Sequence, residues 1–166
     1  MPTHHRGPPH EIGALNAYIK LMRASESISG RVQEVLPADL TETQFAVLEA
    51  LFHLGPLCQG QIAAKLLKST GNLTLVVDNL EKNKLVKRVR SESDRRFVQV
   101  NLTPKGTSVI AALFPKVAAR IAEEFSSLTE PEQVTLAHLC KKLGLESQSA
   151  ARNDQAVSTQ KDRISE

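Results

Sequence analysis

Aromatic side chains are scarce in this sequence: Phe, Tyr and Trp together make up 4% of its 166 residues, and tryptophan is absent. A hydrophobic core must therefore be built mainly from Leu, Val, Ile and Ala, and such a composition favours a mostly helical protein. No apolar run reaches about 18 residues, so we expect no transmembrane helix and no membrane partner.

Cysteine is also rare, because Cys58 and Cys140 are the only two and they have no close partner spacing. The N-terminal residues MPTHHRGPPHEIG contain no apolar stretch after the basic residues, and therefore do not resemble a signal peptide. Together these features predict a reduced, cytoplasmic protein.

Motifs of enzyme active sites are missing as well. The sequence contains no nucleophile with base and acid partners, no glycine-rich phosphate loop and no metal-ligand spacing. We therefore expect no enzymatic activity, no cofactor and no bound metal. His4, His5 and His10 lie in the segment 1–10, which we expect to be flexible with solvated side chains.

Positive charge is concentrated in the middle of the chain, although the net charge of the whole is only +3. Between Leu57 and Gly106 there are ten Lys or Arg residues and four Asp or Glu residues, whereas the remainder is net acidic. A basic centre within acidic surroundings indicates a polyanionic partner. A solvated charged face is the alternative that charge alone leaves open.

Apolar residues repeat with a helical period on both sides of this basic centre. We predict a long helix within 11–36 and further helices within 104–145, the latter beginning after Thr103 as N-cap. Neither apolar stripe is stable alone, so each needs a partner surface. Residues 146–166 have no periodicity and are predicted to form a disordered tail.

Residues 37–103 predict a compact module that begins with three helices. Thr41 and Gln44 have the spacing of a capping box, a short helix follows at 59–66, and Ser69 can cap the third helix. The third helix carries an apolar stripe on one face. The opposite face is mainly polar and carries Thr70, Asn72, Thr74, Leu75, Asp78 and Asn79.

After the third helix the hydrophobic period changes from 3.6 to two. Residues 86–90 and 97–102 are predicted strands, and the charged residues SESDRR between them form the tip of a hairpin. The order of elements predicts a winged helix-turn-helix, mainly α with a small β-hairpin wing. In this fold the third helix can enter a major groove of DNA and the hairpin can reach the adjacent minor groove.

The wing also carries a family signature. Asp94-Arg95-Arg96, followed by Val100, Leu102-Thr103 and Gly106, resembles the pattern D-x-R, then V-x-L-T-x-x-G, of the MarR family. The run STGNLTLVVDNLEKNKLVKRV is similar to that family's recognition helix and first wing strand, and the resemblance covers about residues 11–145. It implies a homodimer built by the N- and C-terminal helices, a palindromic double-stranded DNA operator, and repression that a small molecule or an oxidant usually relieves.

The resemblance and the topology together predict the DNA contacts. Arg96 aligns with a wing-tip arginine that inserts into the minor groove, where a narrow groove attracts a guanidinium. Asp94 aligns with the acidic residue that orients such arginines. A capped, solvated helix face is the alternative for the polar residues of the third helix. The predicted contacts are Ser69, Thr70, Asn72, Thr74, Asn79, Arg88, Asp94, Arg95 and Arg96.

The resemblance places an effector between the dimerisation helices and the DNA-binding module. We predict a small aromatic or phenolic ligand. In the alternative without a ligand site, Phe45 and Leu48 simply fill the core and His53 is a partly buried structural residue. Two other functions stay open: an architectural DNA-binding protein without a ligand, and a redox-sensing repressor that uses the thiol of Cys58. The predicted ligand contacts are Ile19, Met22, Phe45, Leu48 and His53.

Overall fold

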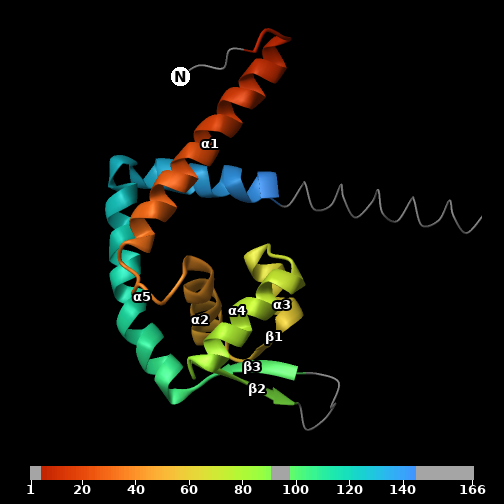
Figure 1. The fold of residues 1–166 in the computed structure, drawn as a ribbon. Helices are drawn as coiled ribbons and strands as arrows, with labels where there is room; N and C mark the ends of the chain where they lie inside the picture. Colours follow the sequence, from red (N-terminus) through yellow and green to blue (C-terminus); the bar gives the residue numbers. More distant parts are fainter. Residues whose placement is uncertain (1–4, 91–97, 145–166) are drawn as a thin grey trace, which may run out of the picture. The chain divides into compact units, whose positions relative to one another are not determined.

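The computed structural model of the chain describes residues 5–90 and 98–144 (Figure 1). The chain forms two compact units that divide at Glu124, and each is described by itself. The predictions for Asp94, Arg95 and Arg96 and for the tail 146–166 concern residues outside the described ranges.

The first unit begins with α1 (Pro9–Gln33), a helix of 25 residues with a proline at its start. The helix begins two residues before the predicted boundary at residue 11. Its apolar stripe is incompletely covered within the unit, since Tyr18 is 60% exposed, Met22 is 50% exposed, and Val32 is the one buried residue of the helix.

Three helices form the centre of the first unit: α2 (Glu42–Leu54), α3 (Gln59–Leu66) and α4 (Thr70–Lys82). The predicted capping box is present at the start of α2. The N–H of Gln44 donates to Oγ1 of Thr41 (3.2 Å), and the N–H of Thr41 donates to Oε1 of Gln44 (2.9 Å). These reciprocal bonds satisfy two backbone donors that the first turn of a helix leaves unpaired.

An aliphatic core joins these helices to the sheet and to the next helix, α5 (Pro104–Glu124). Phe45 is the only aromatic residue of this buried cluster among the described residues, as the composition predicted. The most completely buried side chains are Leu48, Ile62, Leu73, Leu80, Ile110, Val47, Val77, Val86, Val100 and Val117.

The sheet has the strand order β1-β3-β2 and is antiparallel throughout, with β1 (Leu57–Cys58), β2 (Val86–Arg90) and β3 (Val98–Leu102). Its larger part is the predicted hairpin of β2 and β3, in which Val86 lies opposite Leu102. β1 was not predicted, and it pairs with the other edge of β3. The wing is therefore joined by backbone pairing to the loop between α2 and α3.

A tight connection, here named the α4–α5 joint, consists of Lys84, Leu85, Thr103 and Gly106. The hydroxyl of Thr103 donates to the carbonyl oxygen of Lys84 (2.7 Å), and the N–H of Thr103 donates to that of Leu85 (3.0 Å). The N–H of Gly106 donates to Oγ1 of Thr103 (3.0 Å), which confirms the predicted cap. A Cβ atom on Gly106 would overlap the carbonyl oxygen of Leu85, so only glycine fits this position.

The second unit consists, in its described part, of a short 3-10 turn (Phe125–Ser127) and a helix over residues 130–144. Thr129 precedes this helix, and both its N–H and its hydroxyl donate to Oε2 of Glu132 at 2.8 Å. These two bonds lower the pKa of Glu132. Apolar side chains stay exposed along the helix, including Val134 at 70% and Leu143 at 62%.

Candidate nucleic-acid interface

α4 has one face in the core and the opposite face in solvent. On the core side Leu73, Val77 and Leu80 are completely buried. The predicted outer face is exposed at every position, which confirms the division of the helix into two faces. The exposed residues are Thr70, Asn72, Thr74, Leu75, Asp78 and Asn79.

The polar residues at the start of α4 are held by local hydrogen bonds. Oγ of Ser69 accepts from the N–H of Asn72 (3.4 Å), so Ser69 is the predicted N-cap. The hydroxyl of Thr74 donates to the carbonyl oxygen of Thr70 (3.0 Å) and accepts from Nε2 of Gln59 on α3 (3.5 Å). These bonds fix the first turns of α4, where side chains of a recognition helix reach base edges.

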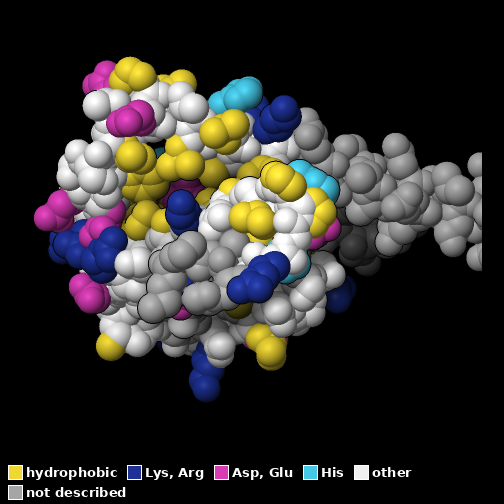
Figure 2. All heavy atoms as spheres, turned by 90° about the horizontal axis from the view of Figure 1, so that it is seen from above, with side chains coloured by type: hydrophobic (Ala, Val, Ile, Leu, Met, Phe, Trp, Pro, Cys, Tyr) yellow, Lys and Arg dark blue, Asp and Glu magenta, His cyan; other side chains and the backbone are white. Residues whose placement is uncertain are grey.

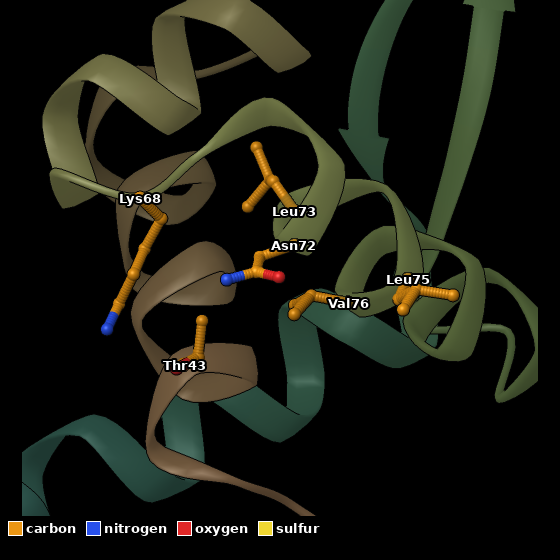
Figure 3. Close-up of a pocket in the computed structure, with 6 residues that line it drawn as sticks. All are labelled: Thr43, Lys68, Asn72, Leu73, Leu75 and Val76. Atoms are coloured by element: carbon orange, nitrogen blue, oxygen red, sulfur yellow. The ribbon is translucent and has the colours of Figure 1, made fainter.

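A cleft of about 320 Å³ lies beside the outer face of α4, between α4 and the start of α2 (Figure 3). Its polar lining comes from Thr43, Lys68 and Asn72, and its apolar lining from α4. Thr43 and Lys68 were not predicted as site residues, because only the packing of α2 against α4 brings them together. The signal that could have found Lys68 is a cation immediately before the N-cap of the predicted recognition helix.

Arg88 on β2 forms a clamp with two carboxylates of α4. Its guanidinium lies 2.6 Å from Oδ1 of Asp78 and 2.6 Å from Oε2 of Glu81, and its backbone N–H donates to Oε1 of Glu81 (2.8 Å). Partial burial opposes the charged form, but the hydrogen bonds with Asp78 and Glu81 outweigh it and raise the pKa of Arg88. The guanidinium therefore stays charged at neutral pH, and it ties the first wing strand to α4.

This clamp also changes the charge of the outer face. Asp78 is exposed on the side of α4 that a polyanion would approach, and an unpaired carboxylate there would repel phosphates. Pairing with Arg88 offsets that charge, while Lys65 on α3, Lys68 before α4 and Lys82 at the end of α4 are exposed. The face is therefore compatible with a negatively charged partner.

Comparisons with known proteins agree with this geometry. The family model of the MarR family matches residues 40–98, from the start of α2 to the start of β3. The uncharacterized HTH-type transcriptional regulator YkoM of Bacillus subtilis is 39% identical over 136 residues, which cover 81% of this chain and 88% of YkoM. The chain belongs to the MarR family.

A second relative supports the same assignment over nearly its whole length. The HTH-type transcriptional regulator MhqR of Bacillus subtilis is 38% identical over 133 residues, which cover 80% of this chain and 92% of MhqR. These relatives are transcriptional regulators, and no enzyme family is indicated. This MarR-family chain is accordingly a DNA-binding transcriptional regulator of the helix-turn-helix type.

Solved structures of MarR-family regulators share the fold. BpsR of Bordetella bronchiseptica, whose DNA binding is regulated by 6-hydroxynicotinic acid, superposes with a TM-score of 0.69 at 27% identity, over 81% of this chain and 98% of that chain. The apo form of MarR from E. coli superposes with a TM-score of 0.62 at 25% identity, over 84% and 98% of the two chains.

The residues predicted to bind an effector lie in different environments. Phe45 and Leu48 are core residues, 9% and 0% exposed, whereas Ile19 and Met22 lie on α1 outside that core cluster. His53, at the end of α2, is exposed, whereas a partly buried side chain was expected. None of the five lines either the cleft described above or a second hollow on α1 beside Tyr18.

His53 nevertheless makes a defined contact with α5. Its ring lies edge-on to Phe114, with centroids 4.7 Å apart, and edge-on to Phe52 at 5.2 Å. Edge-to-face pairs of this kind are typical of aromatic packing. The side chain thus connects α2, which belongs to the DNA-binding module, with α5.

Both cysteines lie within the described ranges, and redox sensing by Cys58 stays a prediction. Cys58 is the N-cap residue of α3 and is half-buried, and its N–H donates to Oε1 of Gln61 (2.9 Å). Cys140 is exposed, and both cysteines are free. Across residues 5–90 and 98–144 we find no cluster of three His, Cys, Asp or Glu suited to a metal ion, and no helix long and apolar enough to cross a membrane.

Proposed function

We propose that this MarR-family regulator is a homodimeric repressor that binds a palindromic operator through α4 and is released by a small aromatic ligand. The observation that carries the proposal is the outer face of α4. It is exposed at every predicted position, while the other side of the helix is closed by a buried core. Such a helix can enter a major groove about 12 Å wide without any rearrangement of its own module.

The dimer is supported by the apolar residues that each unit leaves exposed. Tyr18, Leu21 and Met22 on α1 are 40–60% exposed, and the helix at 130–144 exposes Val134 and Leu143. Hydrophobic side chains are gathered at the surface in the space-filling view of Figure 2. A second copy around a two-fold axis can cover these faces, and it would set two α4 helices about one DNA turn, some 34 Å, apart.

Footprinting on the DNA upstream of the chain's own gene tests this proposal. We expect two protected half-sites whose centres lie about 10 base pairs apart, since each α4 would occupy one major groove. Asn72→Ala should abolish the footprint, because an exposed amide on α4 is a specific partner for a base edge. Ser108→Ala, on the exposed side of α5, is the control. Absence of protection at micromolar protein would contradict the proposal for that DNA.

The effector is supported by one relative and one contact. BpsR responds to 6-hydroxynicotinic acid, a small hydroxylated aromatic acid, and here His53 joins α2 to α5 through Phe114. A ligand bound there can shift the spacing of the two α4 helices only through different affinities for the two arrangements. Couplings of this kind are typically about 1–3 kcal/mol.

A panel of phenolic compounds, titrated into the protein–operator complex and followed by fluorescence anisotropy, tests the effector. We expect at least one compound to weaken operator binding of the wild type by about 5–150-fold. His53→Ala should lose this response, and His10→Ala should keep it. If no compound affects the wild type, phenolic sensing is wrong; if His53→Ala responds like the wild type, the ligand binds elsewhere.

A further inference from the structure

Leu75 is an apolar residue in the middle of the outer face of α4. Its side chain is 68% exposed, and its neighbours on that face, among them Thr74 and Asn79, are polar. The core side of the helix is already filled by Leu73 and Val77, which are completely buried. Leu75 therefore contributes little to the stability of the fold, and its position has to be explained by what the outer face contacts.

The environment of Leu75 combines an apolar side chain with hydrogen-bonding groups. Leu75 and Asn72 lie one helical turn apart, and both line the cleft between α2 and α4. In Figure 3 the side chain of Leu75 projects from α4 away from Thr43 and Asn72. Both residues lie within the first two turns of a helix whose N-terminus is fixed by Ser69, so both are placed where a recognition helix reaches base edges.

The major groove offers an apolar side chain one characteristic partner, the C5-methyl group of thymine. We propose that Leu75 selects DNA sites by packing against thymine methyl groups, one in each half-site of the operator. This inference rests on the proposed function, since it needs α4 in the major groove. It adds a specificity determinant that the predicted set of polar and charged contacts did not contain.

Asn72 makes the selection specific for an A·T pair. A side-chain amide can pair with adenine in a bidentate arrangement. In this arrangement the amide N–H donates to N7, and the amide oxygen accepts from the N6 amino group. The thymine of an A·T pair carries its methyl group in the same groove. The amide of Asn72 thus matches the hydrogen-bonding edge of adenine, and Leu75, one turn away on α4, matches the methyl group of thymine.

The experiment removes single methyl groups from the DNA. The wild-type protein first selects duplexes from a random-sequence library, and each thymine of the enriched duplex is then replaced by deoxyuridine, which lacks only the methyl group. Binding of each duplex is measured by anisotropy for the wild type, Leu75→Ala and Leu75→Met. The control is Leu54→Ala, which truncates a leucine that is 56% exposed at the end of α2.

We expect deoxyuridine at one position per half-site to weaken wild-type binding by about fourfold for each methyl group lost. Leu75→Ala should bind the thymine and deoxyuridine duplexes equally, because the contact is already gone. Leu75→Met and Leu54→Ala should keep the discrimination. The slope of affinity against salt should be the same in all four proteins, since no charge is changed.

Two results would overturn the inference while leaving the proposed function intact. One is an enriched duplex in which no thymine methyl affects wild-type binding. The other is a Leu75→Ala protein that still discriminates between the thymine and deoxyuridine duplexes. This second result includes a Leu75→Ala protein that differs from the wild type only in its oligomeric state by light scattering, which would assign Leu75 to a contact between copies. If the wild type enriches no sequence at all, the proposed function fails and the inference fails with it.

Discussion

α4 and α1 are both amphipathic helices, but they differ in how much of their apolar side the chain itself covers. α4 has 13 residues, and Leu73, Val77 and Leu80 on its apolar side are completely buried. α1 has 25 residues, and only Val32 is buried. A single chain thus buries the apolar side of the shorter helix more fully than that of the longer one.

This difference separates what the chain achieves alone from what needs a second molecule. The module around α4 has its caps, its sheet and its core in one chain, so its outer face can be rigid before DNA arrives. In the proposed dimer, α1 would gain most of its burial from the second copy, because an exposed apolar stripe is stabilised only when it is covered. The predictions below test this contrast, beginning with the largest expected effect.

Truncation of the buried side of α4 should be far more costly than truncation of α1. Leu80→Ala should lower the free energy of unfolding by about 2–5 kcal/mol, because it leaves a cavity in a packed core. Met22→Ala, at a half-exposed position, should change it by about 0.5 kcal/mol or less at low protein concentration. Urea unfolding followed by circular dichroism measures both, and equal losses would break the comparison.

A charge placed in the stripe of α1 should act on assembly and leave the fold of the chain intact. Met22→Asp should weaken the dimer by about a hundredfold, or about 3 kcal/mol, because each interface would bury two unpaired carboxylates. Light scattering over a dilution series measures the shift from dimer to monomer. Lys20→Asp, on the opposite side of α1, is the control; a wild type that is monomeric at micromolar concentration would refute the assignment.

The wing arginine predicted from the sequence, Arg96, should affect DNA binding alone. Arg96→Ala should weaken operator binding by about tenfold and should lower the slope of log affinity against log salt by about 0.9, because one fewer cation meets the DNA. The free energy of unfolding should stay within about 0.5 kcal/mol of the wild type. An unchanged salt slope in an anisotropy titration would contradict the assignment of Arg96.

The clamp of Arg88 should show the reverse pattern and the smallest effect. Arg88→Lys keeps the charge but cannot bridge two carboxylates, so unfolding should become easier by about 0.5–1 kcal/mol, a modest value because the ion pairs are partly exposed. The salt slope of DNA binding should not change. Weaker operator binding with unchanged stability would instead mean that Arg88 contacts DNA directly, as predicted from the sequence.

Local patterns in the sequence were sufficient for most of the fold. The capping box at Thr41, the helix at 59–66 and the two wing strands all depend on residues close together in the chain, and each is confirmed. β1 was missed because a strand of two residues has no periodicity, and it exists only through its pairing with β3. Strand pairing between segments about forty residues apart leaves no local signal.

The candidate site was predicted less completely, for the same reason. The outer face of α4 follows from the helical period, so its residues could be named. The clamp could not be, because Arg88 meets Asp78 and Glu81 only after β2 has turned back along α4. The cleft likewise joins Thr43 to Lys68 across two elements.

The α4–α5 joint has a mechanical consequence for regulation. Thr103 bonds to the backbone of both Lys84 and Leu85, and the carbonyl of Leu85 lies against Gly106, so the end of α4 and the start of α5 cannot change their angle without breaking these contacts. Pro115 removes one backbone hydrogen bond within α5, and this makes the middle of that helix easier to bend than its start. We therefore expect α4 and the first turns of α5 to move together as a rigid lever arm. Bending should occur beyond the joint, near Pro115 in the middle of α5.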